Sequence, residues 1–342
     1  MNPLSSIQKI LESSGYKKDP NGIFTSGRDG YWSNLNKEEN EKFIEELEKS
    51  GPKEAVRKVI PQYEDVIYSP IREGALELLD IKKGSIAIDY GCMWGALSMG
   101  LAKRGASVLA IDQTMDSLRF TAKRSKIEKI DNIICVQDDI RKVQFKNIAD
   151  FSVVNGVLEW VPEFGPIELK KYYGKKLKKK YESINPREIQ KNFLQQVCQN
   201  LKEGGKLLLA IENRFDYTHF LGKPDPHPNL LFTAFLPRWL ADAISRLILG
   251  RPYVNYIYSF PDLKALILSA GFKHVDLYMA YPDYRYPSQI LPYEGGVNRY
   301  QKHWEWRIIS WKRRAAYLVE YILMKYFKAR FFAPSIIAIA EK

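Results

Sequence analysis

The sequence predicts a doubly wound, Rossmann-like α/β fold with a mostly parallel sheet of seven strands. From residue 85 onward, short apolar runs alternate with segments that have the period of a helix, which is typical of parallel strands joined by crossover helices. A turn with Gly91 and Gly95 follows the first run, and Asp112 ends the second, as in many nucleotide-binding sheets. The expected strands are SIAIDY, SVLAID, IICVQ, ADFSVVNG, KLLLAIE, HVDLYMAY and PSIIAIAEK.

The residues before this pattern are expected to form a helical cap, residues 1–84, ahead of a larger domain, residues 85–342. The segment NKEENEKFIEELEKSG has the composition of a charged surface helix, which Gly51 and Pro52 stop. The segment SPIREGALELLDIKKG predicts a second helix, because it opens with a serine and a proline, the usual order at a helix start. The N-terminal region is therefore predicted to be mostly helical.

Two segments of the larger domain break the alternation and are expected to be insertions, at about residues 213–258 and 283–332. The first contains ENRFDYTHFLGKPDPHPN and an apolar helix, LPRWLADAISRLILG, and is expected to lie over the carboxyl edge of the sheet. The second includes residues 303–332, where apolar side chains recur at helical spacing among lysines and arginines. Such a basic amphipathic helix with tryptophans either lies on an anionic membrane surface or packs on the rest of the domain.

The bulk composition limits the partners and the surroundings of the chain. A formal net charge of +12 favours anionic partners such as nucleic acid, phosphorylated substrates or an acidic membrane, unless it is only a solvated, lysine-rich surface. The three cysteines form no CxxC pair and the four histidines are scattered, so neither a disulfide framework nor a metal site is expected. With no signal peptide or spanning segment, the protein is expected to be cytoplasmic, or peripheral at the inner face of the membrane.

Asp89, at the tip of the first strand, distinguishes between the ligands that such a turn can bind. A dinucleotide would place its pyrophosphate at the following helix N-terminus, where an aspartate would repel it. A cationic ligand would be attracted instead, by roughly 4 kcal/mol at about 4 Å and an effective dielectric constant near 20. S-adenosylmethionine has an ammonium, a sulfonium and ribose hydroxyls that suit Asp112. Asp89 therefore favours S-adenosylmethionine as the cofactor, unless it merely caps the turn.

Four segments resemble, in this order, the motifs of class I S-adenosylmethionine-dependent methyltransferases. They are AIDYGCMWGALSMGLAKRGASVLAIDQT, VQDDIRKVQF, ADFSVVNGVLEWVPEF and NLKEGGKLLLAIENRF, and the resemblance covers about residues 65–282 and, in addition, the final strand. Within the family, NGVLEW, AIENRF and AYPDYRYPSQI look most like the branch associated with bacterial surface polysaccharide or glycan biosynthesis. One departure is Met93, which stands where the family's loop commonly has its second glycine.

The resemblance implies a cofactor site at the carboxyl ends of the first four strands. The segment YSPIR, with Tyr68 and Arg72, resembles one that closes over the cofactor. Arg72 would either pair with the cofactor's carboxylate or lie on a helix surface. The other implied contacts are Asp89, Gly91, Cys92 and Gly95 at the methionine end, Asp112 with Gln113 at the ribose, Asp138, Asp139 and Ile140 along the adenine, and Asn155 with Gly156 at the sulfonium.

Methyl transfer is an in-line displacement, so such an enzyme must above all align the acceptor, the methyl group and the sulfur. A hydroxyl acceptor also needs a base, whereas a neutral amine needs less help. His227, in the DPHP loop, is the first candidate for this base, although backbone groups often hold a loop histidine. Glu159, after the fourth strand, is the second candidate, and it would otherwise cap the next helix. The loop that contains His227 also holds Glu212, Asp216 and His219.

The predicted function is O-methylation of a sugar or glycan intermediate, which is lipid-linked if the basic amphipathic segment contacts a membrane. RNA methylation is an alternative that the charge and the lysine-rich run LKKYYGKKLKKKY, residues 169–181, support, although this run is also explained as solvated surface. A methyltransferase-like binding subunit without turnover is a second alternative. The sequence predicts no oligomeric state.

Overall fold

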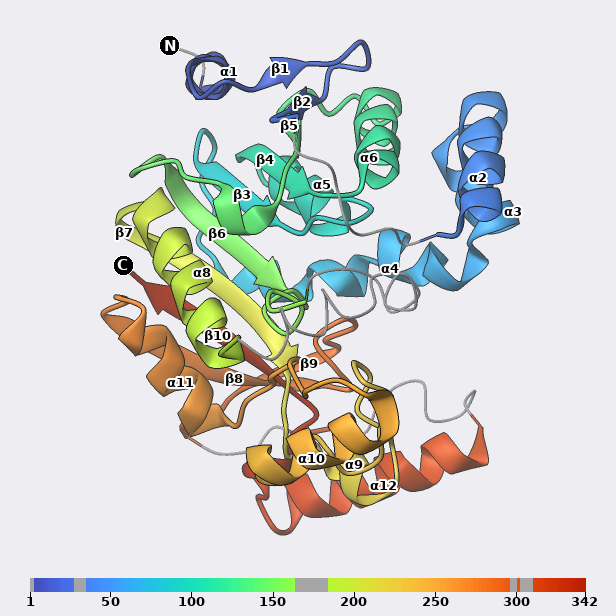
Figure 1. The fold of residues 1–342 in the computed structure, drawn as a ribbon, viewed down its shortest axis with the longest axis vertical. Coiled ribbons are helices and arrows are strands. Elements are labelled where there is room, and N and C mark those ends of the chain that lie inside the picture. The colour runs from blue at the N-terminus through green and yellow to red at the C-terminus, as the bar shows by residue number, and fades with distance from the viewer. Residues whose placement is uncertain (1–2, 28–34, 164–183, 296–299, 302–309) are drawn as a thin grey trace.

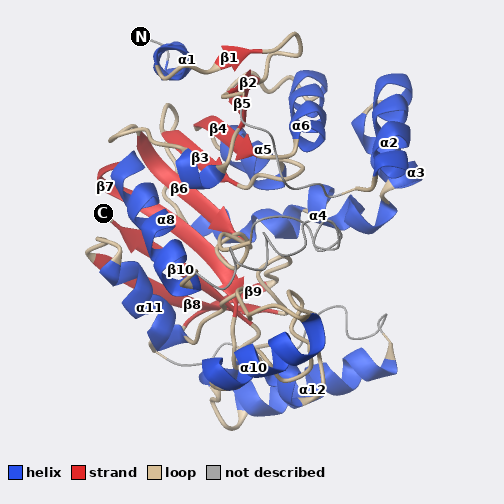
Figure 2. Cartoon of the chain, in the orientation of Figure 1, coloured by secondary structure: helices blue, strands red, loops and turns tan. Residues whose placement is uncertain are grey.

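A central sheet crosses the molecule, and helices cover both of its faces (Figure 2). The lysine-rich run 169–181 and the first part of the basic segment 303–332 lie outside the residues that the structure describes. In the computed structural model (Figure 1), the described residues are 3–27, 35–163, 184–295, 300–301 and 310–342.

The sheet has ten strands in the order β1-β2-β5-β4-β3-β6-β7-β10-β8-β9. Neighbouring strands are parallel from β2 to β7, whereas β10 runs antiparallel to both β7 and β8. All seven expected strands are present, so the Rossmann-like α/β class is confirmed, but the expected number of strands is wrong. The seven are β3 (Ile86–Tyr90), β4 (Ser107–Asp112), β5 (Ile133–Gln137), β6 (Ala149–Asn155), β7 (Leu201–Glu212), β8 (His274–Tyr281) and β10 (Ser335–Glu341).

The three additional strands extend the sheet at its two edges. β1 (Lys17–Lys18) and β2 (Phe24–Thr25) form a short hairpin, and Phe24 pairs with Val136 of β5. At the other edge, β9 (Gln289–Pro292) pairs with β8. Strands of two to four residues are too short for the alternation of apolar and polar residues to become visible, so the sequence pattern could not predict them.

Both faces of the sheet are covered by helices, and every residue of β4 is accordingly buried. On one face, α5 (Ala96–Lys103) contributes Leu97 and Leu101 to an apolar cluster with β3 and β4. On the opposite face, α8 (Pro186–Asn200) and α11 (Phe260–Ser269) pack against the strands in a second cluster. A parallel sheet that is covered on both faces offers a ligand only the ends of its strands.

The N-terminal region contains helices in addition to the hairpin β1–β2. The first expected helix is α2, which begins with a capping box between Asn36 and Glu39 and ends before Gly51. The helix α6 (Met115–Ile127) lies between this region and the sheet. The other N-terminal elements are α1 (Pro3–Ser13), α2 (Lys37–Ser50), α3 (Pro52–Val59), η1 (Pro61–Tyr63) and α4 (Glu64–Tyr68).

The second expected N-terminal helix is wrong in type and length. The segment forms a 3-10 helix, η2 (Pro70–Leu78), rather than an α-helix that continues to Gly84. Gly74 lies in its middle, and glycine lowers α-helix stability by about 1 kcal/mol relative to alanine. A Cβ atom at Gly74 would lie only 3.3 Å from the carbonyl oxygen of Pro287, so the backbone of this segment packs closely against a distant loop.

The helices of the two insertions gather at one end of the molecule. Figure 1 shows α9 (Tyr217–Phe220), α10 (Arg238–Leu249) and α12 (Trp311–Lys325) together at the lower end, beyond the arrowheads of β6 and β7. The helices α9 and α10 of residues 213–258 therefore lie past the carboxyl edge of the sheet. Among the described helices, none combines the length and the apolar character needed to cross a bilayer.

Candidate functional site

Two pockets lie at the carboxyl ends of β3, β4 and β6, and both are lined by Gly91, Met93 and Gly156. The Asp112 pocket has a volume of about 260 Å³, and the Asp89 pocket about 250 Å³. Together they fall within the range of roughly 300–1,000 Å³ that is usual for small-molecule sites. Further lining residues are Gln113, Ile140, Arg141, Val157, Trp160 and Val161 in the first pocket, and Arg72, Cys92, Asn155, Tyr284 and Arg285 in the second.

The two glycines of the first turn allow close approaches to two different parts of the chain. Gly91 and Gly95 both have left-handed backbones, with φ of 67° and 69°. A Cβ atom at Gly91 would lie 2.7 Å from Val157, which lines the Asp112 pocket, so this glycine lets the turn approach the residues that follow β6. A Cβ atom at Gly95 would lie 2.5 Å from Thr121 of α6. Gly95 lines neither pocket, and its close contact is with a helix rather than with the ligand space.

Met93 adopts the left-handed backbone that a glycine would adopt more easily, with φ of 50°. Its N–H donates a hydrogen bond of 2.8 Å to Asp112, and the N–H of Thr114 donates another of 2.8 Å to the same carboxylate. These bonds fix Asp112 in its pocket beside Gln113, and burial raises the pKa of Asp112. The loop thus keeps a glycine-like shape despite the substitution, with the methionine at the junction of the two pockets.

Asp89 is buried at the end of β3 and lines the pocket named after it. One of its carboxylate oxygens accepts a hydrogen bond of 2.6 Å from the hydroxyl of Ser98 in α5. Burial raises the pKa of Asp89 to about 6, although Ser98 and the positive charge of Arg72 act in the opposite direction. A bound ammonium group would favour the ionised carboxylate. Asp89 therefore both anchors α5 and presents a group that suits a cationic ligand.

Arg72 and Tyr68 of the segment YSPIR have different surroundings. Arg72 lines the Asp89 pocket, and its Nε and Nη1 atoms are buried without a hydrogen-bond partner in the described residues. Burial lowers the pKa of Arg72, so a carboxylate bound there would relieve an unfavourable position. Tyr68 lines neither pocket, and its ring instead stacks on the guanidinium of Arg124 at 4.4 Å. Asn155 resembles Arg72, since its buried side-chain nitrogen also lacks a partner.

Only one of the three residues expected along the adenine lines a pocket. Ile140 lines the Asp112 pocket, whereas Asp138 and Asp139 line neither pocket. Asp138 accepts hydrogen bonds from the hydroxyls of Tyr16, at 2.5 Å, and Ser26, at 2.9 Å. Asp139 forms an ion pair of 2.8 Å with Arg141, and Arg141 lines the pocket in its place. Asp138 therefore holds Tyr16 and Ser26 of the N-terminal region, and Asp139 holds Arg141 in the wall of the pocket.

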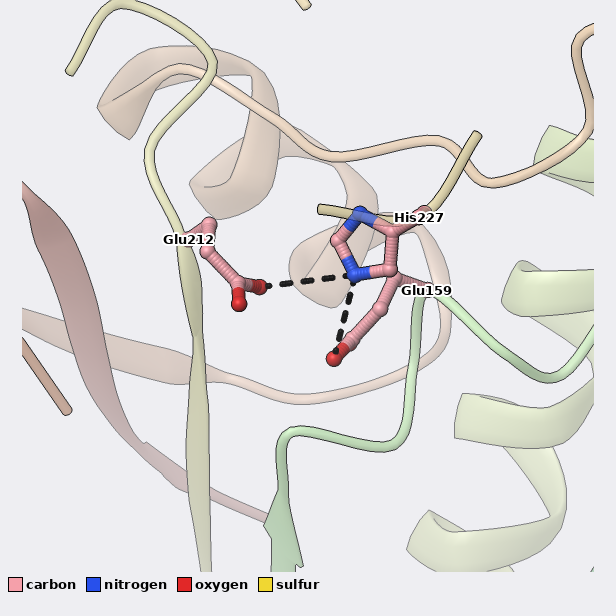
Figure 3. A group of neighbouring side chains, drawn as sticks. All are labelled: Glu159, Glu212 and His227. Carbon is pink, nitrogen blue, oxygen red and sulfur yellow. Dashed lines mark ion pairs between the residues drawn. The ribbon is translucent and has the colours of Figure 1, made fainter. Parts of the chain in front are cut away.

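Glu159, Glu212 and His227 converge beside these pockets, and Figure 3 shows their side chains pointing toward one another. We name them the carboxylate–histidine cluster. The Nε2 atom of His227 lies 3.8 Å from Glu159 and 3.7 Å from Glu212. Both oxygens of Glu159 are buried without a hydrogen-bond partner among the described residues, as is one oxygen of Glu212. Such unpaired buried acceptors are costly, which indicates a place where a ligand supplies the missing donors.

The cluster adjoins both pockets through two aromatic side chains. Trp160, which lines the Asp112 pocket, contacts the ring of His227 with a centroid distance of 4.9 Å. Tyr284, which lines the Asp89 pocket, donates a hydrogen bond of 3.2 Å to Glu212. A Cβ atom at Gly156, which both pockets share, would lie 2.5 Å from the Tyr284 hydroxyl. The cluster is thus adjacent to the place where the two pockets meet.

Asp225 fixes the orientation of His227. The Nδ1–H of His227 donates to Asp225 at 2.9 Å, and the hydroxyl of Tyr253 donates to the other oxygen of Asp225 at 2.6 Å. The loop is closed by backbone hydrogen bonds between Asp225 and Leu230, so His227 sits in a shaped turn between two prolines. Because Nδ1 is engaged, Nε2 is the ring nitrogen that faces the two glutamates.

The protonation of the cluster follows from its burial and its charges. Burial raises the pKa of Glu159 to about 7, while the neighbouring His227, at 3.8 Å, acts to lower it. Burial acts to lower the pKa of His227, but the negative charges of Glu212, Asp225 and Glu159 outweigh it and hold that pKa well above its usual value. At neutral pH, His227 therefore carries a proton, and Glu159 is close to the midpoint of its titration.

The same three side chains also have the spacing of a metal site. Their ligand atoms lie within 4.8 Å of one another, and two carboxylates with one imidazole form a set of ligands that suits a divalent cation. No metal site is expected from the sequence, because the three residues come from separate segments and form no spacing motif.

A family model described as a methyltransferase domain matches residues 81–219. Residues 81–219 are thus similar to a methyltransferase domain. The predicted methyltransferase, with S-adenosylmethionine as its cofactor, is thereby confirmed at the level of this domain family. The matched range includes the turns after β3 and β6 that line the pockets, and it also includes Glu159 and Glu212. His227 lies just beyond the matched range.

Solved structures with a similar fold are distant in sequence. A phosphoethanolamine N-methyltransferase 2 from Haemonchus contortus is 13% identical with a TM-score of 0.48, over 88% of this chain and 60% of that protein, so this chain spans less than two thirds of its length. A methyltransferase from Aquifex aeolicus is 14% identical with a TM-score of 0.41, over 67% and 92% of the two chains. One from Mesorhizobium loti is 14% identical with a TM-score of 0.44, over 79% and 96%. No curated protein matches the sequence.

Two members of the carboxylate–histidine cluster, Glu159 and His227, were predicted from the sequence as the base, and Glu212 was noted in the same loop as His227, but the residues that support them were missed. Asp225 stands in the DPHP loop and could have been found, since an acid two residues before a histidine is a common partner. Tyr253 comes from a segment without a motif, and Tyr284 lies in AYPDYRYPSQI, a segment for which the resemblance implies no role of this tyrosine. Asp216 and His219, the other candidates in the first insertion, have structural contacts: Asp216 caps α9, and the Nδ1 atom of His219 lies 3.1 Å from the carbonyl oxygen of Lys223.

Proposed function

We propose that this methyltransferase transfers the methyl group of S-adenosylmethionine to a hydroxyl of a sugar or glycan intermediate that is linked to a lipid. The observation that carries the proposal is the pair of unpartnered carboxylate oxygens of Glu159, buried at 0% exposure beside the junction of the pockets. An acceptor hydroxyl is a donor that satisfies such oxygens, and its proton must be removed during O-methylation.

Glu159 is better suited than His227 to accept this proton. Because three carboxylates surround His227, its imidazole is already protonated at neutral pH and has no free lone pair to act as a base. Glu159, with a pKa of about 7, is partly ionised at that pH, and a base is most effective when its pKa lies near the working pH. His227 is then a positively charged neighbour that Asp225 holds in place and that stabilises the ionised Glu159.

The reaction balances as one displacement. The acceptor oxygen attacks the methyl carbon, the bond between that carbon and the sulfur breaks, and its electron pair stays on sulfur to give S-adenosylhomocysteine. The hydroxyl proton passes to Glu159. Asp89 and Arg72 would hold the ammonium and carboxylate ends of the cofactor, Asp112 its ribose, and Ile140 its adenine, so that the sulfonium lies near Gly156 and the cluster.

Two features support a sugar-like acceptor over RNA. Trp160 and Tyr284 border the cluster, and aromatic walls with a few directed polar groups are typical of sites for small polar molecules. The resemblance of NGVLEW, AIENRF and AYPDYRYPSQI to glycan-associated methyltransferases points in the same direction.

The test is to incubate the full chain with S-adenosylmethionine that carries a radiolabelled methyl group and with separated cell fractions: lipid-linked glycans, water-soluble glycans and RNA. We expect the label in the lipid-linked glycan fraction, as a methyl ether that withstands mild base and stays on the sugar after mild acid releases the lipid. Glu159→Gln should abolish this labelling.

Other distributions of the label would overturn the proposal. Label in RNA that ribonuclease releases would favour RNA methylation, and tight cofactor binding without label in any fraction would favour a binding subunit. A second control is a chelator followed by added Mg²⁺, Mn²⁺ or Zn²⁺. If the chelator abolishes transfer and one cation restores it, the cluster holds a metal and Glu159 is not the base.

A further inference from the structure

One end of the molecule exposes most of the large apolar side chains found on the described surface. All but two of the fifteen exposed large apolar side chains lie in the two insertions, and those two are Ile127 and Leu268. Single exposed apolar side chains are ordinary, but a group of them marks a binding surface. We name this group the apolar end, and it consists of Phe220, Leu221, Leu231, Phe232, Trp239, Leu247, Ile248, Leu249, Trp311, Leu318, Ile322, Tyr326 and Phe327.

The two insertions that form the apolar end are joined to each other. The ring of Phe220 in the first insertion stacks on Phe235 at 4.5 Å and contacts Phe332 of the second insertion at 5.7 Å. The hydroxyl of Tyr217 in α9 donates a hydrogen bond of 2.9 Å to Glu320 of α12. These contacts agree with the gathering of α9, α10 and α12 at the lower end of Figure 1. The two insertions therefore pack against each other at this end of the molecule.

Both long helices of the apolar end pack with one side and leave the other side open. Helix α10 buries Ala241 and Ser245, whereas Trp239 is 73% exposed and Leu247 is 87% exposed. Helix α12 buries Tyr317, Glu320 and Met324, whereas Trp311 is 74% exposed. Packing on the domain thus explains only the inner side of each helix. The outer sides retain apolar surface that a further partner would cover.

The charges around the apolar end indicate which kind of partner binds it. Exposed cations lie among its apolar side chains, while the acids of the two helices are engaged: Glu320 is buried against tyrosines, and Asp242 pairs with Arg246. Cores of protein–protein interfaces are poor in lysine, whereas helices in a membrane interface combine tryptophan and leucine with lysine and arginine. The exposed cations are Arg246, Lys312, Arg313, Arg314, Lys325 and Lys328.

We propose that the apolar end binds the surface of an anionic lipid bilayer. Its apolar side chains lie at the boundary of headgroups and acyl chains, and its cations contact the anionic headgroups. His227 belongs to the loop between α9 and α10, so binding in this orientation brings the carboxylate–histidine cluster close to the bilayer. That this location serves a lipid-linked acceptor rests on the proposed function, whereas the binding itself does not.

The experiment measures cosedimentation of the full chain with vesicles of phosphatidylcholine alone or with about 30% phosphatidylglycerol. We expect binding to the anionic vesicles that weakens as salt is added, since salt screens headgroup attraction. The double variant Leu247→Glu/Ile248→Glu should lower the partition coefficient by at least about tenfold, because it places charge in the apolar boundary. The matched control Ile127→Glu/Leu268→Glu, on exposed apolar positions elsewhere, should lower it less than about twofold.

A failure of this proposal is distinguishable from a failure of the proposed function. If the wild type ignores anionic vesicles, or if the two double variants bind equally, the apolar end is not a membrane surface. If sedimentation velocity shows a dimer that Leu247→Glu/Ile248→Glu dissociates, a second copy of the chain covers it instead. Vesicle binding requires neither cofactor nor acceptor, so binding without methyl transfer would overturn only the proposed function.

Discussion

The cofactor side and the acceptor side of the site are built in opposite ways. On the proposed cofactor side, Asp112 and Asn155 end their strands and Asp89 is the residue before the end of β3. On the acceptor side, Glu212 ends β7 and Glu159 follows β6, but His227 comes from an insertion whose loop is held by Asp225. The first half is thus fixed by a local repeated pattern, and the second by contacts between distant segments.

This difference predicts which properties of the protein a substitution in each half would alter. The cofactor side depends on close backbone approaches such as those of Gly91 and Gly156, where a side chain would collide with Val157 or Tyr284. The acceptor side depends on buried charges that balance one another. Substitutions on the cofactor side should therefore alter binding and stability, whereas those on the acceptor side should alter the rate and its dependence on pH.

The largest effect is expected from Glu159→Gln. Loss of the base should lower kcat by a factor of about 10² to 10⁴. In the wild type, kcat/KM should rise with pH through about 7, because only the ionised form of Glu159 accepts a proton. This rise should disappear in Glu159→Gln, and His227→Gln should instead move it to higher pH, because Glu159 then loses the neighbouring positive charge.

The measurement is a pH profile of methyl transfer for the three proteins, with thermal unfolding as a check of the fold. The opposite pattern, a profile that is flat in His227→Gln but keeps its rise in Glu159→Gln, would make His227 the base.

A smaller effect, on binding, is expected from Asp89→Asn. Removal of the negative charge should weaken the binding of S-adenosylmethionine by about 10- to 1,000-fold, measured by calorimetry with NAD as a negative control. Binding that is unchanged in the variant would show that Asp89 serves only to hold Ser98.

The same substitution should raise stability at neutral pH. Burial raises the pKa of Asp89 from 3.8 to about 6, so the folded state holds this proton more strongly than the unfolded state. The associated stability is complete below pH 3.8 and is lost as pH rises through about 6. Asp89→Asn should therefore raise the free energy of unfolding by about 1–3 kcal/mol at pH 7 and little at pH 4, measured by urea denaturation.

The smallest effect on binding is expected from Asp138→Asn, although the family resemblance assigns Asp138 to the adenine. Because its carboxylate faces Tyr16 and Ser26, the substitution should change the Kd for the cofactor by less than about threefold and lower stability by about 1–2 kcal/mol. The matched variant Asp112→Asn, at a residue that lines the pocket, should weaken binding more. A tenfold loss of affinity in Asp138→Asn would show instead that Asp138 contributes to cofactor binding.

The sequence predicted the parts of the molecule that rest on local patterns. The seven strands, Asp89, Asp112 and the loop at Gly91 follow from alternation and from turn composition, which act within a few residues. The position of Asp138 depends instead on Tyr16, more than a hundred residues away, and that of His227 depends on Tyr253 through Asp225. Such pairings leave no hydrophobic period or motif spacing in the sequence, because the paired residues meet only in the folded chain.

The position of β10 has a consequence for how the chain folds during synthesis. β10 pairs with β7 on one side and β8 on the other, yet about 120 residues separate it from the end of β7. At roughly 5–20 residues per second, a ribosome needs on the order of ten seconds to add them. During that time β7 has an open edge with Leu207, Leu209 and Ile211, the kind of edge that pairs with foreign strands. The nascent chain should therefore depend on chaperones until residues 335–341 have emerged.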